Sequence, residues 1–247
     1  GDGREYFWDT DETTCTDLGF NYDSDDGCLA YTDETRVKDV ILNPDNFANL
    51  SDFDVANIAE LQHEDKLGRL KMLTTEGKGD DDEYEEIHSF GARSITIWDT
   101  AGNVVWDSGD IMEQVTAEYL PDDFNSTNDE NDTFKNRSDD KGPEPENVVV
   151  GRAFGRQYAF VGLERVGGIM IFDISDPANG RYVAYHNNRN FSAENNDDDN
   201  LEGKDAGDLG PEGIAFIKAE DSPNGEPLLV VGNEVSGTTT IWQIVKD

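Results

Sequence analysis

Five glutamates stand beside short apolar runs in the second half of the chain. Glu164 and Glu234 each close such a run, Glu144 and Glu212 each end a Gly-Pro-Glu triplet, and Glu146 lies close behind Glu144. Ca²⁺ prefers carboxylate and carbonyl oxygens as ligands. The residue types therefore predict a calcium site, with Ca²⁺ as cofactor, whose ligands are Asp2, Glu144, Glu146, Glu164, Glu212 and Glu234.

Clustered carboxylates repel one another unless positive charge lies among them. Arg4, Lys141 and Arg165 are placed to supply that charge, with Arg93 a further partner, and the first three are also candidate substrate-binding groups. Two interpretations stay open. Either the carboxylates hold a cation or a substrate at one shared site, or they cap turns and pair with arginine to fix the geometry of the fold.

Signals for nucleophilic catalysis are poor, and no catalytic residue is assigned. His63, His88 and His186 occur in unrelated contexts, and the sequence has no G-x-S-x-G, no zinc-binding Cys/His pattern and no phosphate-cradling glycine loop. A phosphoesterase could still use Ca²⁺ to activate water, with Arg4, Lys141 and Arg165 on the phosphate.

A repeated set of strands must position these residues. One copy begins at Gly142-Pro143-Glu144 and the other at Gly210-Pro211-Glu212, which sets the corresponding glycines 210 − 142 = 68 residues apart. Each copy reads as short strands of one β-propeller blade with long acidic loops. The expected strands cover residues 94–98, 104–106, 147–150, 158–164, 168–174, 182–185, 214–217, 228–234 and 238–244.

The predicted fold is all-β, a partial propeller of about two to three blades. Residues 87–247 form the blades, and the last blade lacks one strand. Residues 1–86 form an Asp-rich region, with a loop over 1–35, strands over 36–42 and 68–73, and a short helix over 52–61. Because closed propellers need more blades, the expected partners are the remaining blades, from the N-terminal part of a precursor or from another chain, with self-assembly or a surface partner as a further possibility.

The formal net charge is −36, from 55 acidic and 19 basic residues. Such a field repels nucleic acid and anionic lipid, and suits a protein that stays soluble in saline surroundings. The chain has no apolar run long enough to span a membrane. Cys15 and Cys28 predict a disulfide, with two free thiols as the alternative. Sequons occur at Asn49, Asn125, Asn131 and Asn190.

Several motifs resemble the choice-of-anchor I family: SDDKGPEPE at 138–146, GLERVGG at 162–168, DLGPEG at 208–213 and NEVSGTT at 233–239. Shorter matches at 1–6, 36–39, 67–70 and 90–94 extend the resemblance over nearly the whole chain. The resemblance implies a secreted or surface-displayed bacterial β-propeller, and some members are described as atypical alkaline phosphatases. The chain departs from the family pattern in lacking its N-terminal half and in its cysteine-containing insert.

These observations together predict a secreted or cell-surface, calcium-binding β-propeller module that acts in binding or surface assembly. The first alternative is a calcium-dependent phosphoesterase of the alkaline-phosphatase type with its site at the mouth of the propeller channel. The second is a structural component of an extracellular fibre or coat.

Overall fold

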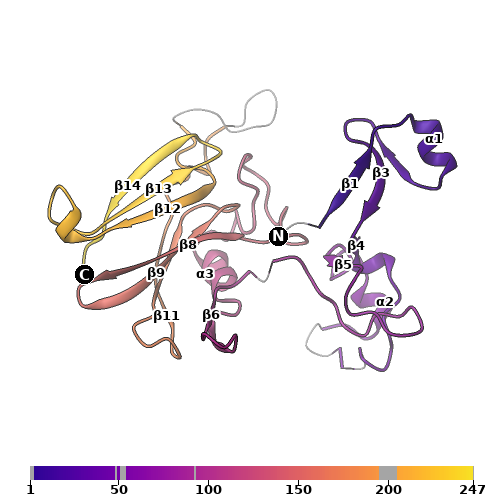
Figure 1. The fold of residues 1–247 in the computed structure, drawn as a ribbon, viewed down its shortest axis with the longest axis horizontal. Helices are drawn as coiled ribbons and strands as arrows, with labels where there is room; N and C mark the ends of the chain where they lie inside the picture. Colours follow the sequence, from indigo (N-terminus) through magenta and orange to yellow (C-terminus); the bar gives the residue numbers. More distant parts are fainter. Residues whose placement is uncertain (1–2, 48, 51–53, 92, 195–204, 247) are drawn as a thin grey trace. The chain divides into compact units, whose positions relative to one another are not determined.

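The protein is described by a computed structural model that covers residues 3–47, 49–50, 54–91, 93–194 and 205–246. The chain divides into two compact units, residues 1–91 and residues 92–247 (Figure 1). Within the described residues the fold is all-β with few helices, as predicted, and all pairings between named strands are antiparallel.

Unit 1 begins with a three-stranded sheet of β1 (Glu5–Trp8), β2 (Asn21–Asp23) and β3 (Gly27–Thr32), in the order β1-β3-β2. Helix α1 (Glu12–Asp17) lies between β1 and β2, and the Asp11 side chain caps it by accepting a hydrogen bond from the Thr14 backbone N–H. The predicted loop over residues 1–35 is therefore wrong.

A disulfide joins this helix to the sheet. Cys15 of α1 is bonded to Cys28 of β3, with their Cα atoms 5.5 Å apart, and both side chains are fully buried. The predicted disulfide is thus confirmed. Across β1 and β3 the rings of Tyr6 and Tyr31 pair with centroids 5.7 Å apart. The covalent link and the aromatic pair give an Asp-rich segment the contacts that its short apolar runs do not supply alone.

The rest of unit 1 surrounds a second small core. Strands β4 (Glu34–Arg36) and β5 (Lys71–Leu73) pair, the 3₁₀ helix η1 (Val37–Asp39) follows β4, and α2 (Ile58–Leu61) ends in the core. The buried apolar side chains are Val37, Leu42, Leu50, Leu61, Met72 and Tyr84. The predicted strand over 36–42 is wrong, because the chain turns at η1. The predicted helix over 52–61 survives only as α2, and its residues 52–53 lie outside the described residues.

Unit 2 is built on a four-stranded meander. It consists of β8 (Pro145–Ala153), β9 (Arg156–Leu163), β10 (Ile169–Asp173) and β11 (Arg181–His186), in the order β11-β10-β9-β8. Successive side chains of β9 point to opposite faces of the sheet and so pack into two different cores. Phe160 lies in one core, and Ala159 and Val161 lie in the other. The four strands predicted for this copy of the repeat are confirmed.

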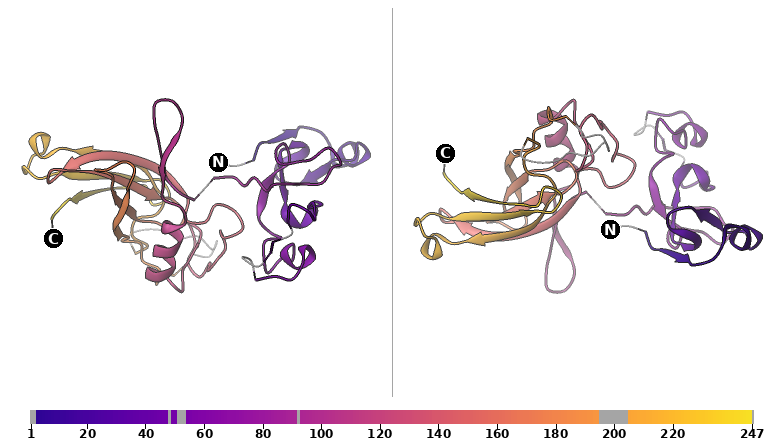
Figure 2. Two further views of the ribbon diagram at one scale, coloured as in Figure 1. Left: turned by 90° about the horizontal axis from the view of Figure 1, so that it is seen from below. Right: turned by 90° about the horizontal axis from the view of Figure 1, so that it is seen from above.

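A three-stranded sheet packs against the meander. It contains β12 (Pro211–Ile217), β13 (Leu228–Asn233) and β14 (Thr238–Gln243), in the order β12-β13-β14, with the 3₁₀ helix η3 (Ala219–Asp221) after β12. Strand β12 lies against β8 and β9, and the two sheets form adjacent layers (Figure 2). The rings of Phe160 and Phe216 stack between the layers with centroids 5.8 Å apart.

The opposite face of the meander is covered by a hairpin and a helix. Strands β6 (Thr96–Trp98) and β7 (Val104–Asp107) pair, and α3 (Ile111–Tyr119) follows them. Met112 of α3 is fully buried in the same core as Phe172, whose ring meets that of Trp106 at 5.9 Å. The helix lies in the connection over 108–142, where the sequence predicted no element.

The strand register corrects the predicted alignment of the repeat. Pro145 lies opposite Leu163 in the first sheet and Pro211 lies opposite Asn233 in the second, and each pairing is followed by an irregularity in register. The equivalent prolines are thus 211 − 145 = 66 residues apart. In the second strands of the two sheets the offset is 228 − 158 = 70 residues. Tyr158 of β9 lies opposite Asp173, and Leu228 of β13 lies opposite Gln243 in the same way.

This offset changes which glutamates correspond. The Glu164 N–H donates to the carbonyl of Glu144 at 2.9 Å, and the Glu234 N–H donates to the carbonyl of Gly210 at 2.8 Å. Glu144 and Gly210 also share positive φ angles, 52° and 67°. Glu144 is therefore equivalent to Gly210, and Glu146 is equivalent to Glu212. Layered antiparallel sheets fit propeller blades, but the described elements form no closed ring, so the propeller itself stays a prediction.

The contact between the two sheets can be tested at a glycine. A Cβ added to Gly151 of β8 would lie 2.4 Å from the ring of Phe216, whereas one added to Gly213 of β12 would meet nothing within 4 Å. Gly151→Ala should lower the free energy of unfolding by roughly 1–3 kcal/mol through overpacking. Gly213→Ala, the matched control, should change it by about 0.5 kcal/mol or less. Equal effects in urea denaturation would contradict this packing.

Candidate functional site

Three carboxylates gather where β8 begins and β9 ends. One oxygen from each of Glu144, Glu146 and Glu164 lies within 4.8 Å of the others, and among the described residues no other group of three or more potential His, Cys or carboxylate ligands is this close. Glu144 precedes β8, Glu146 is the second residue of β8, and Glu164 follows β9. We call these three residues the glutamate cluster.

Glu144 is the anchored member of the cluster. It is 6% exposed, and its left-handed backbone (φ 52°) is a conformation that side chains other than glycine adopt at a cost. Its carboxylate forms an ion pair with the Lys141 Nζ and accepts a hydrogen bond from the Arg165 Nε at 2.5 Å. Burial without these two cations would carry a large desolvation penalty. Lys141 and Arg165 therefore neutralise Glu144.

Glu164 is less well compensated. It is 9% exposed, its Oε1 accepts a hydrogen bond from the Asn128 Nδ2 at 3.0 Å, and the Arg165 guanidinium lies 3.5 Å from the same oxygen. Burial and the nearby Glu144 charge raise the pKa of the Glu164 carboxyl from 4.5 to about 7. Glu146 is exposed beside it. The cluster thus contains a carboxyl group that is only partly ionised near neutral pH.

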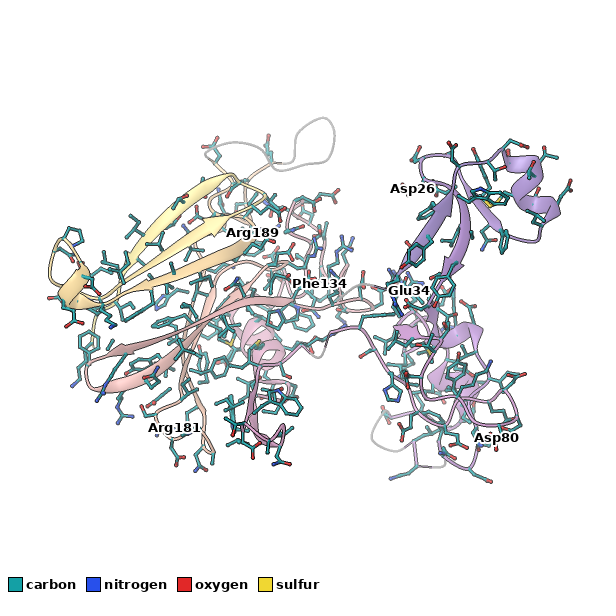
Figure 3. All side chains as sticks on the ribbon, in the orientation of Figure 1. Asp26, Glu34, Asp80, Phe134, Arg181 and Arg189 are labelled. Carbon is teal, nitrogen blue, oxygen red and sulfur yellow. A yellow bond between two sulfur atoms is a disulfide. The ribbon has the colours of Figure 1, made fainter. Side chains whose placement is uncertain are left out.

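A buried arginine holds the loop that brings Asn128 to the cluster. Arg189, 7% exposed, donates to the carbonyls of Thr127 at 2.6 Å and Glu130 at 2.5 Å, and to the carbonyl of Arg165 at 3.2 Å (Arg189 is labelled in Figure 3). Burial lowers the pKa of Arg189 to about 10, so the side chain remains charged at neutral pH. It fixes the loop and the β9–β10 turn in one network.

Arg93 supports the same region from another side. Its guanidinium donates to the Glu113 carboxylate at 2.8 Å and to the carbonyls of Ser138 at 2.7 Å and Asp140 at 3.0 Å. The sequence predicts a pairing of Arg93 with the clustered glutamates, but these hydrogen bonds hold the segment that leads to Lys141. Arg93 is therefore a positioning residue for the approach to the glutamate cluster.

The remaining predicted site residues lie elsewhere or outside the description. Glu212 and Glu234 are exposed and do not belong to the glutamate cluster. Arg4, in unit 1, donates through its Nε to Asp33 at 2.8 Å. Asp2 lies outside the described residues.

Sequence reasoning missed Asn128 and Arg189. Asn128 stands in an Asn-rich acidic connection, where nothing distinguishes it from its neighbours. Arg189 follows β11 and reaches backbone carbonyls more than fifty positions earlier in the chain. Such contacts depend on how the loop folds back, which no local motif specifies. A basic residue within an otherwise polar, uncharged stretch was the available signal.

The sequence profile of the choice-of-anchor I domain matches residues 1–177. The chain belongs to the choice-of-anchor I family. The match includes the glutamate cluster and its cations, whereas the motifs at 208–213 and 233–239 lie beyond the matched residues. No helix among the described residues is long and apolar enough to cross a membrane.

Two curated proteins are similar to this family member. "Gigasin-3a" of Magallana gigas is 31% identical over 194 residues, which is 76% of this chain and 68% of that protein. The "Mesenchyme-specific cell surface glycoprotein" of Strongylocentrotus purpuratus is 31% identical over 113 residues, 40% of this chain and 14% of that protein. No solved structure matches the chain.

The raised pKa of Glu164 makes stability depend on pH. Because the folded protein holds this proton more tightly than the unfolded chain, stability should fall as pH rises from 4.5 to about 7. The loss amounts to about 3 kcal/mol at most, by the conversion of pKa shifts to free energy. In calcium-free buffer Glu164→Gln should remove this slope and be the more stable form at pH 8.

The exposed Glu212→Gln is the matched control and should keep the wild-type slope. Urea unfolding at pH 5, 6, 7 and 8 measures both variants. If Glu164→Gln is less stable than the wild type at pH 8, the ionised Glu164 carboxylate stabilises the fold. The inference that this charge lowers stability would then be wrong.

Proposed function

We propose that this choice-of-anchor I chain is an extracellular or cell-surface module of propeller type that acts in binding or surface assembly and takes Ca²⁺ at the glutamate cluster. The surface placement rests on the family and on the name of the Strongylocentrotus purpuratus relative, a cell surface glycoprotein. Layered antiparallel sheets with a repeated register support the propeller architecture.

One observation carries the calcium proposal. Glu144 is neutralised by Lys141 and Arg165. Among the described residues, the one ion pair of Glu164 is with the Arg165 Nη1 at 3.5 Å, and the Glu146 carboxylate lies within 4.8 Å of the Glu164 carboxylate. A Ca²⁺ ion bound by Glu164 and Glu146 would supply the missing positive charge and keep Glu164 ionised. The exposure of Glu146 leaves room for water, which commonly completes calcium coordination.

The phosphoesterase alternative gains less from this geometry. It requires Lys141 and Arg165 to bind a phosphate group, yet both contact Glu144 and are mostly buried, with side chains 11% and 21% exposed. Arg4, the third residue of that proposal, contacts Asp33 in unit 1. The described arrangement therefore favours a structural role for these basic side chains over a role in binding an anionic substrate.

Calcium should stabilise the protein through this site. At a concentration of 100 times the dissociation constant, binding to the folded state alone adds about 2.7 kcal/mol. Thermal unfolding at pH 8 with CaCl₂ or EGTA should show a calcium-dependent rise in Tm, and calorimetry should show a matching binding event. Glu146→Gln should remove most of that rise, because it replaces a charged ligand at an exposed position and leaves the core unchanged.

Glu212→Gln is the structurally matched control, since Glu212 occupies the position of Glu146 in the second copy of the repeat. It should respond to calcium as the wild type does. If both variants respond alike, the ion binds elsewhere on the acidic surface. If neither variant nor the wild type responds, the cluster serves only to fix the fold.

A further inference from the structure

Four exposed aromatic side chains share one face of the small sheet in unit 1. Trp8 of β1, Cys28 of β3 and Tyr22 of β2 lie directly opposite one another, in a row across the three strands. Opposite residues of antiparallel strands point to the same face of a sheet. Tyr6 lies two residues before Trp8 on β1, so it points to that face as well.

An irregularity in the strand pairing adds the fourth ring. The register of β1 and β3 shifts between Tyr6 and Phe7, which places Tyr31 and not Ala30 opposite Tyr6. A β-bulge redirects side chains in this way. The rings of Tyr6 and Tyr31 accordingly lie with their centroids 5.7 Å apart. We call Tyr6, Trp8, Tyr22 and Tyr31 the aromatic face.

The aromatic face is accessible and firmly supported. Its four residues are between 38% and 59% exposed, and none of them belongs to a buried core among the described residues. Cys28, in the middle of the row, is fully buried and bonded to Cys15 of α1. Contiguous exposed apolar side chains mark interaction sites on soluble proteins. A fixed support lowers the conformational entropy that binding costs.

The charge along this segment indicates what kind of ligand fits. Residues 5–32 contain eight acidic residues and no Lys, Arg or His. The neighbouring Arg4 is neutralised by Asp33, which accepts its Nε at 2.8 Å and its backbone N–H at 2.6 Å. Aromatic rings in a negative field attract cations, and the planar guanidinium of arginine also stacks on tyrosine and tryptophan. A second copy of this acidic chain would be repelled instead.

We propose that the aromatic face is a docking site for a basic, arginine-bearing polypeptide segment of a partner protein. Guanidinium groups of the segment stack on the rings, and the carboxylates of residues 5–32 attract it over a longer range. A neutral oligosaccharide also stacks on aromatic rings, but it gains nothing from the negative field. The inference does not depend on the glutamate cluster or on calcium.

Calorimetric titration of the intact chain with the peptide GRGRGRGRGR, in EGTA, tests this proposal. Trp8→Ala and Tyr31→Ala should each weaken binding roughly twofold to thirtyfold, the range that cation–π contacts span. Raising NaCl from 50 mM to 300 mM should weaken the binding to the wild type. Phe7→Ala is the matched control, because Phe7 is 39% exposed on the same strand and points to the opposite face. It should bind as the wild type does.

Amide chemical shifts of the wild type, titrated with the same peptide, locate the site without any substitution. The largest changes should fall on β1, β2 and β3. If they fall outside residues 5–32, or if Phe7→Ala weakens binding as much as Trp8→Ala, the peptide binds elsewhere on the acidic surface and the proposal is wrong. Binding of maltohexaose to the wild type but not to Trp8→Ala, without binding of the peptide, would overturn it in favour of a carbohydrate.

Discussion

The burial of one carboxylate, that of Glu144, constrains the rest of unit 2. A glutamate that is 6% exposed and has a positive φ needs compensating charge, and Lys141 and Arg165 provide it from the preceding turn and from the β9–β10 turn. That pairing fixes where β8 begins and where β9 ends. It also brings Glu164 and Glu146 together. Within the part of the chain that the structure describes, the buried Glu164 carboxyl group has no cation closer than the Arg165 guanidinium at 3.5 Å.

Much of unit 2 could be predicted from the sequence because its strands are short apolar runs between acidic loops. The same runs do not determine how the two copies of the repeat align. The sequence GPEPE offers two Pro-Glu pairs, and the first gives an offset of 68, whereas the strand pairing selects the second and gives 66. The irregular pairing at Pro145 and Pro211, together with the equivalent hydrogen bonds to the carbonyls of Glu144 and Gly210, distinguishes them. The sequence therefore predicted Glu212 and Glu234 as ligands of the same calcium site as Glu144, Glu146 and Glu164, whereas among the described residues only the latter three lie together.

The elements that the sequence did not predict depend on contacts between distant residues. Helix α3 has acidic and polar residues through much of its length, and the burial of Met112 against the meander is what stabilises it. The sheet of β1, β2 and β3 is joined to α1 by the Cys15–Cys28 disulfide. Asn128 reaches Glu164 because Arg189 binds the backbone of its loop. Local propensity predicts neither α3, nor the sheet of β1, β2 and β3, nor the contact of Asn128 with Glu164.

The charge state of Glu164 tests the proposed role of the glutamate cluster most directly. Carbon-13 NMR of the side-chain carboxyl, titrated from pH 4 to pH 9 with and without CaCl₂, reports it for this one residue. We predict a pKa of about 7 without calcium, caused by burial and by Glu144, and a clear decrease when calcium binds. A pKa near 4.5 that calcium leaves unchanged would contradict both the destabilising effect of the Glu164 charge and the proposed cation site.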